Sequence, residues 1–442
     1  SPKQLANRDY IFSTIKSNFK KFGFQPIETP SFELAETLLG KYGEEGDRLI
    51  FKILNSGDKV KKADLQALED GNLARFSNSL TEKALRYDLT VPFARYVAQY
   101  QNDIVFPFKR YQIQPVWRAD RPQKGRFQEF YQCDADVVGS KSLWQEIEFI
   151  QLYDAVFSDL KLEGVTIKIN NRKILAGIAE LIGAQDKLID FTVALDKLDK
   201  IEAEKVKEEM LNKGIAAEGI SKLEPLFNLT GDFSEQLQSL KSILSTSTEG
   251  IKGVEELEFI ASSVAALGLK TAKLQMDVTL ARGLNYYTGA IYEVAAPDSV
   301  QMGSIGGGGR YDDLTGIFGL KDVSGVGISF GLDRIYLVLE ELNLFPSDKT
   351  QSTKVLFINF GTSESLYSLK AITALRSNSI ATELYPDAAK LKKQMMYCNK
   401  REIPYVVMVG ESEMEQNKYL LKDMNSGEQQ LVDLEALTKI VS

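Results

Sequence analysis

The hydrophobic positions near the start of the chain repeat at helical spacing. Residues 8–24 predict an amphipathic helix, because four apolar side chains fall on one of its faces. These side chains are Ile11, Ile15, Phe19 and Phe22. Pro26 ends the pattern, since proline has no N–H with which to continue a helix. Residues 27–30 are then predicted as a short strand.

Two later stretches have a β-rich pattern. Residues 104–138 are apolar and β-rich, and a polar loop around Pro122 and Gly125 interrupts them. Residues 141–160 return to a helical period. The β pattern resumes over residues 271–295.

A long helical segment separates these two β-rich stretches. Residues 186–262 are rich in Lys, Glu and Leu at helical spacing and contain little strand pattern. We therefore expect a helical insertion. The strands on either side of it, up to the segment 303–331, predict one antiparallel sheet that the insertion interrupts.

The last part of the chain alternates between strands and helices. A polar linker over residues 346–352 precedes this pattern, which predicts a small α/β domain at residues 353–442. Asn425-Ser426-Gly427 predicts a hairpin turn within it. The predicted first domain comprises residues 1–185 and 263–345, so the chain is expected to be a multidomain α+β and α/β protein.

The composition excludes several kinds of chemistry. The 442 residues include no histidine and only two cysteines. A Ser-His-Asp triad, a His-ligated zinc site and a disulfide framework are therefore excluded, and a reducing cytoplasm is the expected compartment. The net charge of −8 argues against a protein that coats DNA or other nucleic acid through bulk positive charge. Neither a membrane span nor a signal peptide is expected, since no apolar run reaches bilayer length.

The sharpest motif is a strand, a basic loop and a returning strand over residues 106–136. The first strand delivers Arg118, and the loop carries Arg121, Lys124 and Arg126. Cations at the tip of such a hairpin can hold a triphosphate, because guanidinium groups bridge its oxygens. The residue-by-residue order favours this function over an ordinary solvated turn.

This segment resembles motif 2 of the class II aminoacyl-tRNA synthetases in its histidyl form. Four other segments resemble, in chain order, motif 1, two histidine-specific signatures and motif 3 of that family: residues 24–33, 282–289, 303–312 and 327–334. The C-terminal domain resembles the family's anticodon-binding domain. The resemblance implies a class II antiparallel sheet flanked by helices, and motif 1 implies a homodimer.

The implied reaction is activation of L-histidine by ATP, followed by transfer of histidine to the 3′ end of tRNA(His). The attacking carboxylate is already ionised at neutral pH, so a chain without histidine can perform the activation. By resemblance, the catalytic residues are Arg118 and Arg282, which contact the α-phosphate. Arg126 and Arg334 resemble the ligands of the β- and γ-phosphates, and Phe130 resembles the ring that stacks on adenine. The ATP chemistry implies Mg²⁺.

The resemblance also implies a pocket for the amino acid. Asp136 and Tyr287 would hold the imidazole, while Asp88 and Gln132 would hold the α-amino group. The full implied histidine-binding set is Asp88, Thr90, Gln132, Asp136, Arg282, Tyr286, Tyr287 and Tyr311. The acceptor end of tRNA is assigned to Arg121, Gln123 and Lys124. The chain departs from the family pattern where Asn285 replaces Asp and where Asp88 and Asp136 replace Glu.

Several of these features have plainer interpretations. Arg282 and Arg334 can form ordinary ion pairs, and Asp88 can be a helix cap. The glycine cluster 306–309 lacks the Lys-Ser/Thr ending of a P-loop. It is either a strand that lies close to the bound amino acid or a flexible loop. A basic set on the helix predicted at residues 391–402 either contacts tRNA phosphates or is a solvated face: Lys390, Lys392, Lys393, Lys400 and Arg401.

Two other functions remain as alternatives. One is the synthetase-like regulatory subunit of histidine biosynthesis, although the C-terminal domain and the complete arginine set argue against it. The other is a class II synthetase for proline, threonine or glycine, against which the segment 282–289 argues. The absence of histidine has two explanations: an enzyme that does not need histidine for its own synthesis, or deliberate replacement.

Overall fold

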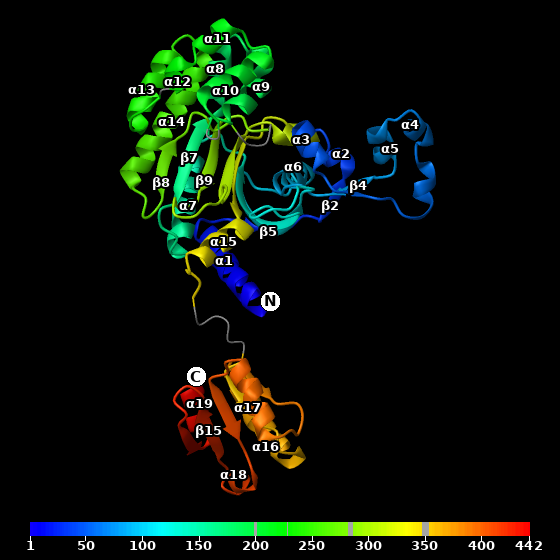
Figure 1. The fold of residues 1–442 in the computed structure, drawn as a ribbon, viewed down its shortest axis with the longest axis vertical. Coiled ribbons are helices and arrows are strands. Elements are labelled where there is room, and N and C mark those ends of the chain that lie inside the picture. Colours follow the sequence, from blue (N-terminus) through cyan, green and yellow to red (C-terminus); the bar gives the residue numbers. More distant parts are fainter. Residues whose placement is uncertain (199–200, 228, 282–285, 347–352) are drawn as a thin grey trace. The chain divides into compact units, whose positions relative to one another are not determined.

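The computed structural model describes residues 1–442 except 199–200, 228, 282–285 and 347–352 (Figure 1). Contacts divide the chain into two compact units, which are described separately. One unit is Arg8–Phe345, and the other is Pro346–Ser442 together with Ser1–Asn7. None of the described helices is long and apolar enough to cross a membrane.

An eight-stranded sheet forms the centre of the larger unit. Its spatial order is β1-β5-β6-β11-β10-β9-β7-β8. In chain order the strands are β1 (Gln25–Pro26), β5 (Phe108–Trp117), β6 (Glu129–Val138), β7 (Thr166–Asn171), β8 (Lys273–Met276), β9 (Ala290–Ala295), β10 (Gly306–Tyr311) and β11 (Gly325–Gly331). The six inner strands pair antiparallel with one another, as expected of an antiparallel sheet. The sheet as a whole is mixed, because β1 and β8 are parallel to β5 and β7 at its two edges.

The first strand lies earlier than the sequence predicts. Residues 27–30 were the expected strand, whereas β1 comprises Gln25 and Pro26. Proline is tolerated at position 26 because β1 lies at the edge of the sheet. The outer side of an edge strand makes no backbone hydrogen bonds, so the missing N–H leaves no partner unsatisfied there. The backbone N–H of Ile27 still donates to Tyr111 O at 3.0 Å and extends the pairing by one residue.

One face of the sheet is buried beneath helices. The main covering helices are α1 (Pro2–Lys21), α7 (Trp144–Asp159), α14 (Thr248–Leu267) and α15 (Leu332–Glu341) (Figure 1). Because side chains alternate along a strand, β6 sends Cys133, Ala135 and Val137 into this core, where each is at most 1% exposed. The even-numbered side chains of β6 therefore face the opposite side of the sheet.

Seven helices connect β7 to β8. They are α8 (Arg172–Leu181), α9 (Leu188–Leu195), α10 (Ala203–Asn212), α11 (Ala217–Ser221), α12 (Glu224–Phe227), α13 (Phe233–Ile243) and α14. The predicted insertion at residues 186–262 falls within this helical segment. The segment itself begins earlier, because Asn171 at the end of β7 caps α8 by accepting from the N–H of Lys173.

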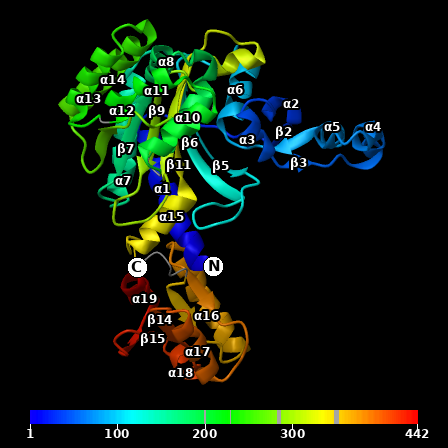
Figure 2. The same cartoon turned by 45° about the horizontal axis from the view of Figure 1, so that its top comes forward.

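An arm that the hydrophobic pattern did not predict projects from the larger unit (Figures 1 and 2). It contains a small sheet of β2 (Phe32–Leu34), β4 (Lys83–Leu85) and β3 (Lys52–Ile53), with the helices α4 (Leu65–Glu69) and α5 (Leu73–Ser79). Next to it lie α2 (Ala35–Leu38), α3 (Gly43–Arg48) and α6 (Thr90–Gln99). Buried Arg86 ties the base of the arm to the main sheet, since its guanidinium donates to Thr29 O and Pro115 O.

The C-terminal unit is a five-stranded sheet with helices on both faces. Its strands, in the order β13-β12-β14-β15-β16, are β12 (Val355–Phe357), β13 (Thr382–Leu384), β14 (Tyr405–Met408), β15 (Tyr419–Asp423) and β16 (Gln429–Val432). Its helices are α16 (Thr362–Ser377), α17 (Leu391–Lys400), α18 (Glu411–Glu415) and α19 (Leu434–Val441). The predicted hairpin around Asn425 is confirmed by the antiparallel pairing of β15 with β16.

Candidate active site

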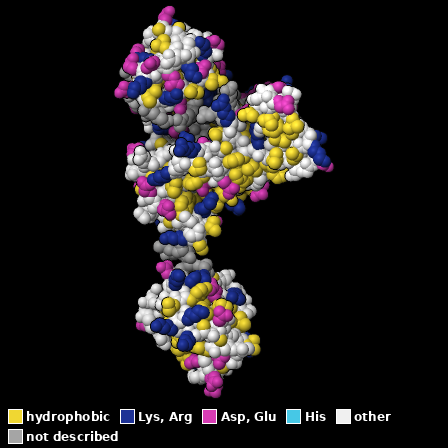
Figure 3. Space-filling view, turned by 45° about the vertical axis from the view of Figure 1, so that its right-hand side comes forward, with side chains coloured by type: hydrophobic (Ala, Val, Ile, Leu, Met, Phe, Trp, Pro, Cys, Tyr) yellow, Lys and Arg dark blue, Asp and Glu magenta, His cyan; other side chains and the backbone are white. Residues whose placement is uncertain are grey.

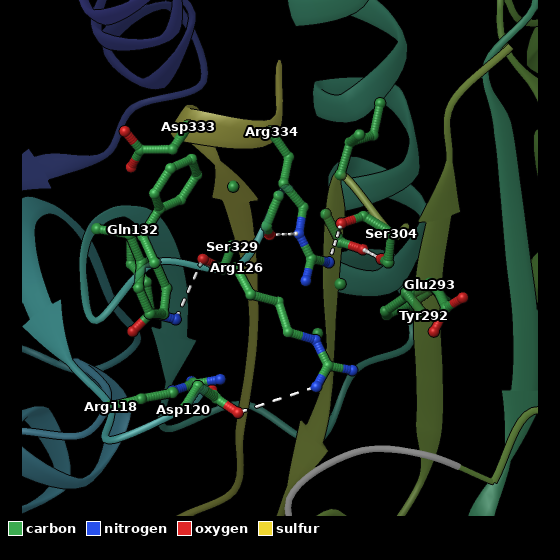
Figure 4. Close-up of a pocket in the computed structure, with 18 of the residues that line it drawn as sticks. Arg118, Asp120, Arg126, Gln132, Tyr292, Glu293, Ser304, Ser329, Asp333 and Arg334 are labelled. Carbon is green, nitrogen blue, oxygen red and sulfur yellow. Dashed lines mark hydrogen bonds and ion pairs between the residues drawn. The ribbon is translucent and has the colours of Figure 1, made fainter. Parts of the chain in front are cut away.

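A cavity of about 470 Å³ opens on the uncovered face of the main sheet. Side chains from β6, β11 and the start of α15 form one wall, and the loop between β5 and β6 forms another (Figure 4). The strand β10 contributes Gly306, Gly307 and Gly308 to the lining. Residues that are far apart in the sequence therefore meet at this cavity.

The side chains at the floor of the cavity lie in rows across the sheet, because the strand register places them opposite one another. Phe130 and Gln132 line the cavity, and Asp134 and Asp136 follow on the same face of β6. Asp134 lies opposite Gln112 on β5 and Ser329 on β11. A row of polar side chains therefore crosses the sheet beneath the cavity.

Glycines on β10 and β11 make room for two of the predicted site residues. A Cβ on Gly309 would lie 2.9 Å from Cδ1 of Tyr287, and a Cβ on Gly327 would lie 2.0 Å from Oδ1 of Asp136. Gly306 to Gly309 thus belong to a paired strand, so the alternative of a flexible loop is wrong.

Arginine side chains gather at the rim of the cavity. The guanidinium carbon of Arg118 lies 4.1 Å from the ring centre of Tyr87 and 5.2 Å from that of Phe130. Arg334 donates from Nε to Gly125 O and from Nη1 to Ser304 O, both at 2.7 Å (Figure 4).

The positive charge at this rim has an electrostatic cost. Burial lowers the pKa of Arg334, and the nearby charges of Arg126 and Arg118 lower it further. Arg126 is half exposed, and its closest charged partner is Asp120 at 3.9 Å. An anionic ligand between these three groups would relieve their mutual repulsion. Arg282, which is predicted to complete the set, lies outside the described residues, as does Asn285.

Asp88 is buried and accepts hydrogen bonds through both of its oxygens. Its Oδ1 accepts from the hydroxyl of Tyr42 at 2.8 Å and from the N–H of Val91 at 3.1 Å, while its Oδ2 accepts from the hydroxyl of Tyr286 at 3.0 Å. Burial raises the pKa of Asp88, although these hydrogen bonds oppose that effect. The N–H of Val91 lies in the first turn of α6, which begins at Thr90. Asp88 therefore makes a helix-capping contact and also lies next to cavity-lining Tyr87.

Asp136 is also paired within the protein. Its Oδ2 lies 2.8 Å from Nη2 of Arg110, and its Oδ1 accepts from the hydroxyl of Tyr311 at 2.6 Å. Tyr287 lines the cavity, and its ring stands edge-on to Tyr286 at 5.0 Å.

Models of two protein families match this chain. The model described as histidyl-tRNA synthetase matches residues 68–335, and the model described as anticodon binding domain matches residues 354–442. The chain belongs to the histidyl-tRNA synthetase family.

Relatives in this family match nearly the whole length of the chain. The histidine–tRNA ligase of Christiangramia forsetii is 68% identical over 99% of this chain and 96% of its own length. That of Flavobacterium johnsoniae is 64% identical with the same coverage of both chains. The crystal structure of histidyl-tRNA synthetase from Nostoc sp. superposes with a TM-score of 0.80 at 31% identity, covering 100% of this chain and 96% of that one.

For a histidyl-tRNA synthetase, ATP is a substrate, and the structure brings several predicted residues to one cavity. Arg118, Arg126, Phe130, Gln132, Tyr287 and Arg334 all line it. Asp88 and Asp136 lie close enough to Tyr287 to raise its pKa, after burial as the main cause. The tRNA-directed residues Arg121, Gln123 and Lys124 lie in the loop and do not line the cavity, and Lys124 pairs with Glu341 at 3.3 Å.

The structure also places residues at the site that the sequence analysis missed. Arg110, Asp134 and Ser329 lie on the floor, and Tyr42 supports Asp88. Burial raises the pKa of Asp134 to about 7, because the nearby guanidinium of Arg110 only partly offsets the cost of burying a charge. The signal for Asp134 was present in the sequence, since it shares a strand face with Gln132 and Asp136.

Proposed function

We propose that this protein is a histidine–tRNA ligase that forms histidyl-adenylate and pyrophosphate from L-histidine and ATP, then transfers histidine to the 3′ end of tRNA(His). One observation carries the site assignment. Guanidinium groups from the β5–β6 loop and from α15 surround the rim of a cavity whose floor holds buried carboxylates.

The rim suits the phosphates of ATP. In the proposed arrangement, Arg118 contacts the α-phosphate and the attacking carboxylate, and Arg282 contacts the α-phosphate from the other side. Arg126 and Arg334 hold the β- and γ-phosphates, and Phe130 stacks on adenine. No general base is needed, so catalysis comes from alignment and from neutralising charge on the pentacoordinate phosphorus.

The floor suits the amino acid. Asp88 and Gln132 would bind the α-ammonium group, with Thr90 beside them, and Tyr286 would fix the Asp88 carboxylate through its hydroxyl. Tyr287, Asp136 and Tyr311 would surround the imidazole. A pocket with fixed polar partners rejects apolar analogues, because those partners would be left without hydrogen bonds.

Mg²⁺ would enter as the complex with ATP, with the phosphate oxygens as its main ligands. Among the described residues, no group of three or more Cys, Asp or Glu side chains forms a metal site. We propose Glu293 as a carboxylate beside the bound Mg²⁺. It lines the cavity, and it lies close enough to Arg334 for its negative charge to raise the pKa of that guanidinium.

ATP–pyrophosphate exchange with each amino acid tests the proposed reaction. Exchange is expected with histidine and not with proline, threonine or glycine. Arg334→Gln should raise the KM for ATP at least about tenfold, because it removes a charged hydrogen-bonding group worth about 1.5–3 kcal/mol. The control is Arg376→Gln in the C-terminal unit, whose guanidinium donates to Thr382 O and to no other group among the described residues. Absence of exchange with histidine would leave the regulatory-subunit alternative standing.

Recognition of tRNA is proposed to involve both ends of the molecule. In this division, residues 1–185 and 263–345 form the catalytic domain, 186–262 the insertion, and 353–442 the anticodon-binding domain. Arg121, Gln123 and Lys124 would contact the acceptor end. Lys392 and Lys393 are exposed on α17 and would contact phosphates near the anticodon.

Charge reversal on α17 tests the anticodon contact. The double variant Lys392→Glu and Lys393→Glu should raise the KM for tRNA and leave ATP–pyrophosphate exchange unchanged. Lys370→Glu, at an exposed position on α16, is the matched control. Equal effects of the two changes on the KM for tRNA would refute a specific contact.

A homodimer is proposed from the apolar surface of the arm. Large hydrophobic side chains are exposed there: Phe32, Leu34, Leu54, Leu65 and Leu73 are 46–66% exposed (Figure 3). Exposed apolar patches of this kind mark protein interfaces. The double variant Leu65→Glu and Leu73→Glu should therefore shift the mass in light scattering from twice 49.4 kDa to a single chain. Leu267→Glu, on an exposed leucine of α14, should not.

A cytoplasmic location is the remaining part of the proposal. The two cysteines, Cys133 and Cys398, are both free and buried. Free thiols persist in a reducing compartment.

A further inference from the structure

The floor of the cavity holds acceptor oxygens without donors. Within the described part of the chain, no hydrogen bond reaches Oδ1 of Asp134, Oε1 of Gln132 or Oε1 of Gln112, although all three atoms are buried. Buried acceptors without donors are costly and rare in folded proteins. Three of them side by side suit a ligand that brings N–H donors. The guanidinium nitrogens of Arg110 also lack hydrogen bonds in this part of the chain, but the ion pair with Asp136 holds them.

Asp134 differs from the two other carboxylates near the floor. Asp88 accepts three hydrogen bonds, and Asp136 is paired with both Arg110 and Tyr311. Among the described residues, the hydroxyl of Ser329 is the one group within hydrogen-bonding reach of Asp134. The positive charge of Arg110, which is paired with Asp136, also attracts the Asp134 carboxylate. Asp134 is 2% exposed, so bulk water does not compensate its charge.

Asp134 does not itself line the cavity, but two residues next to it do. Its cross-strand neighbour Ser329 and its strand neighbour Gln132 both line the cavity. Beyond Ser329, the next residue in the row is Gly307, which has no side chain and also lines the cavity. A planar ring entering over Gly307 would therefore have its edge directed at Ser329 and Asp134.

The charges of the floor favour a ligand that brings positive charge. Arg110 is the buried guanidinium that offsets the charges of Asp134 and Asp136, and the charge of Arg118 acts on Asp88. Histidine supplies an ammonium group with three N–H donors and a ring with at least one. The ammonium group suits Asp88 and Gln132, which leaves the ring N–H for the carboxylate that has an empty oxygen.

We propose that Asp134 is a further specificity-determining residue for histidine, whose free carboxylate oxygen accepts a hydrogen bond from a ring N–H of the bound imidazole. This inference rests on the proposed function. Asp136 then has a different task, because its Oδ1 accepts from Tyr311 and its Oδ2 forms an ion pair with Arg110: it holds these two side chains in position around the ring.

The test is the isosteric change Asp134→Asn, measured by ATP–pyrophosphate exchange. An amide places an N–H donor or a weaker acceptor where the carboxylate stood. The KM for histidine should rise at least about tenfold, as expected for loss of a hydrogen bond to a charged group, while the KM for ATP stays within about twofold. An unchanged KM for histidine would overturn the inference.

A second substrate separates recognition from general damage. Thiazol-4-yl-alanine has a ring of the same size with a ring nitrogen and no N–H. The parent enzyme should discriminate strongly against it, because a site built around an N–H rejects an analogue that lacks it. Asp134→Asn should reduce that discrimination about tenfold or more, and equal discrimination by both proteins would refute the proposed contact.

Asp154→Asn is the matched control for removing a buried carboxylate. Asp154 is 5% exposed on α7 and accepts from the backbone N–H groups of Lys270, Thr271 and Ala272. This variant should unfold at a lower temperature with an unchanged KM for histidine. If Asp134→Asn also lowers the unfolding temperature and raises both KM values together, Asp134 is structural and the inference fails. If the parent protein shows no exchange with histidine, the proposed function itself fails.

Discussion

Asp134→Asn should stabilise the protein without ligand, most strongly at alkaline pH. The folded-state pKa of Asp134 is raised to about 7 from the ordinary value of 3.8, because burial disfavours its charge. The groups that face it are Arg110 and Gln112 from β5, Asp136 from its own strand, and Ser329 from β11. The buried carboxylates Asp136 and Asp88 oppose its ionisation, whereas the charge of Arg110 and the hydrogen bond from Ser329 favour it.

The sign follows from the direction of this shift. A group with a raised folded pKa contributes its full stability below the unfolded pKa and loses it as pH rises through the folded pKa. For Asp134 the loss runs from about pH 4 to about pH 7 and amounts to at most about 4 kcal/mol, since about 3 pH units each correspond to about 1.4 kcal/mol. Between about pH 5.5 and pH 7 the loss is about 2 kcal/mol. Asparagine has no such titration.

Thermal unfolding at about pH 5.5 and pH 8.5 measures the effect. The Tm of Asp134→Asn minus that of the parent should increase by about 2–4 °C from the lower to the higher pH, as expected for about 2 kcal/mol in a domain of this size. Asp154→Asn, which removes a carboxylate that accepts three backbone N–H groups, should be less stable than the parent at both values. A parent protein more stable than Asp134→Asn at pH 8.5 would mean that attraction to Arg110 exceeds the cost of burying the charge, and the reasoning would be wrong.

Three further predictions concern packing, charge and ligand binding. Glu146→Gln should lower the stability by about 3–5 kcal/mol, because it removes the buried charged partner of the Arg310 guanidinium and leaves only the more distant, partly exposed Asp312 at 3.7 Å among the described residues; Asp58→Asn, in a pair exposed on both sides, should leave the Tm unchanged. Gly327→Ala should raise the KM for histidine and lower the Tm, since its Cβ would lie 2.0 Å from Oδ1 of Asp136, and unaltered values would contradict that geometry. L-histidine at a hundred times its Kd should stabilise the protein by about 2.7 kcal/mol in a thermal shift assay, whereas L-alanine should give no shift.

The sequence predicted the parts of the fold that have a clear hydrophobic period. The inner strands other than β7, and the helical segment between β7 and β8, were expected because their patterns extend over many residues. The arm was missed because β2, β3 and β4 are two or three residues long and too short to display a period. The parallel edge strand β1 was misplaced for the same reason.

The sequence predicted the rim of the site better than its floor. Arg118, Arg126 and Arg334 stand in motifs whose residue order identifies them, and all three line one cavity. Asp134 and Arg110 were missed because their importance depends on which strands pair with which. The strand register, which places Asp134 opposite Ser329, is not visible in the sequence. Neither is the burial of Asp134, which makes its ionisation unfavourable.

The proposed site has positive charges at its rim and negative charges at its floor. This arrangement favours one orientation of the bound amino acid. Histidine in the opposite orientation would bring its carboxylate to Asp88 and Asp134 and its ammonium group to Arg118, so that like charges would meet at both ends in a partly desolvated space. The proposed orientation instead places the ammonium group and the ring at the floor. The carboxylate then points to the rim, where the arginines would hold the α-phosphorus. In the proposed arrangement, the same charges would select the amino acid and present its nucleophilic oxygen to ATP, so recognition and alignment for in-line attack would depend on one set of residues.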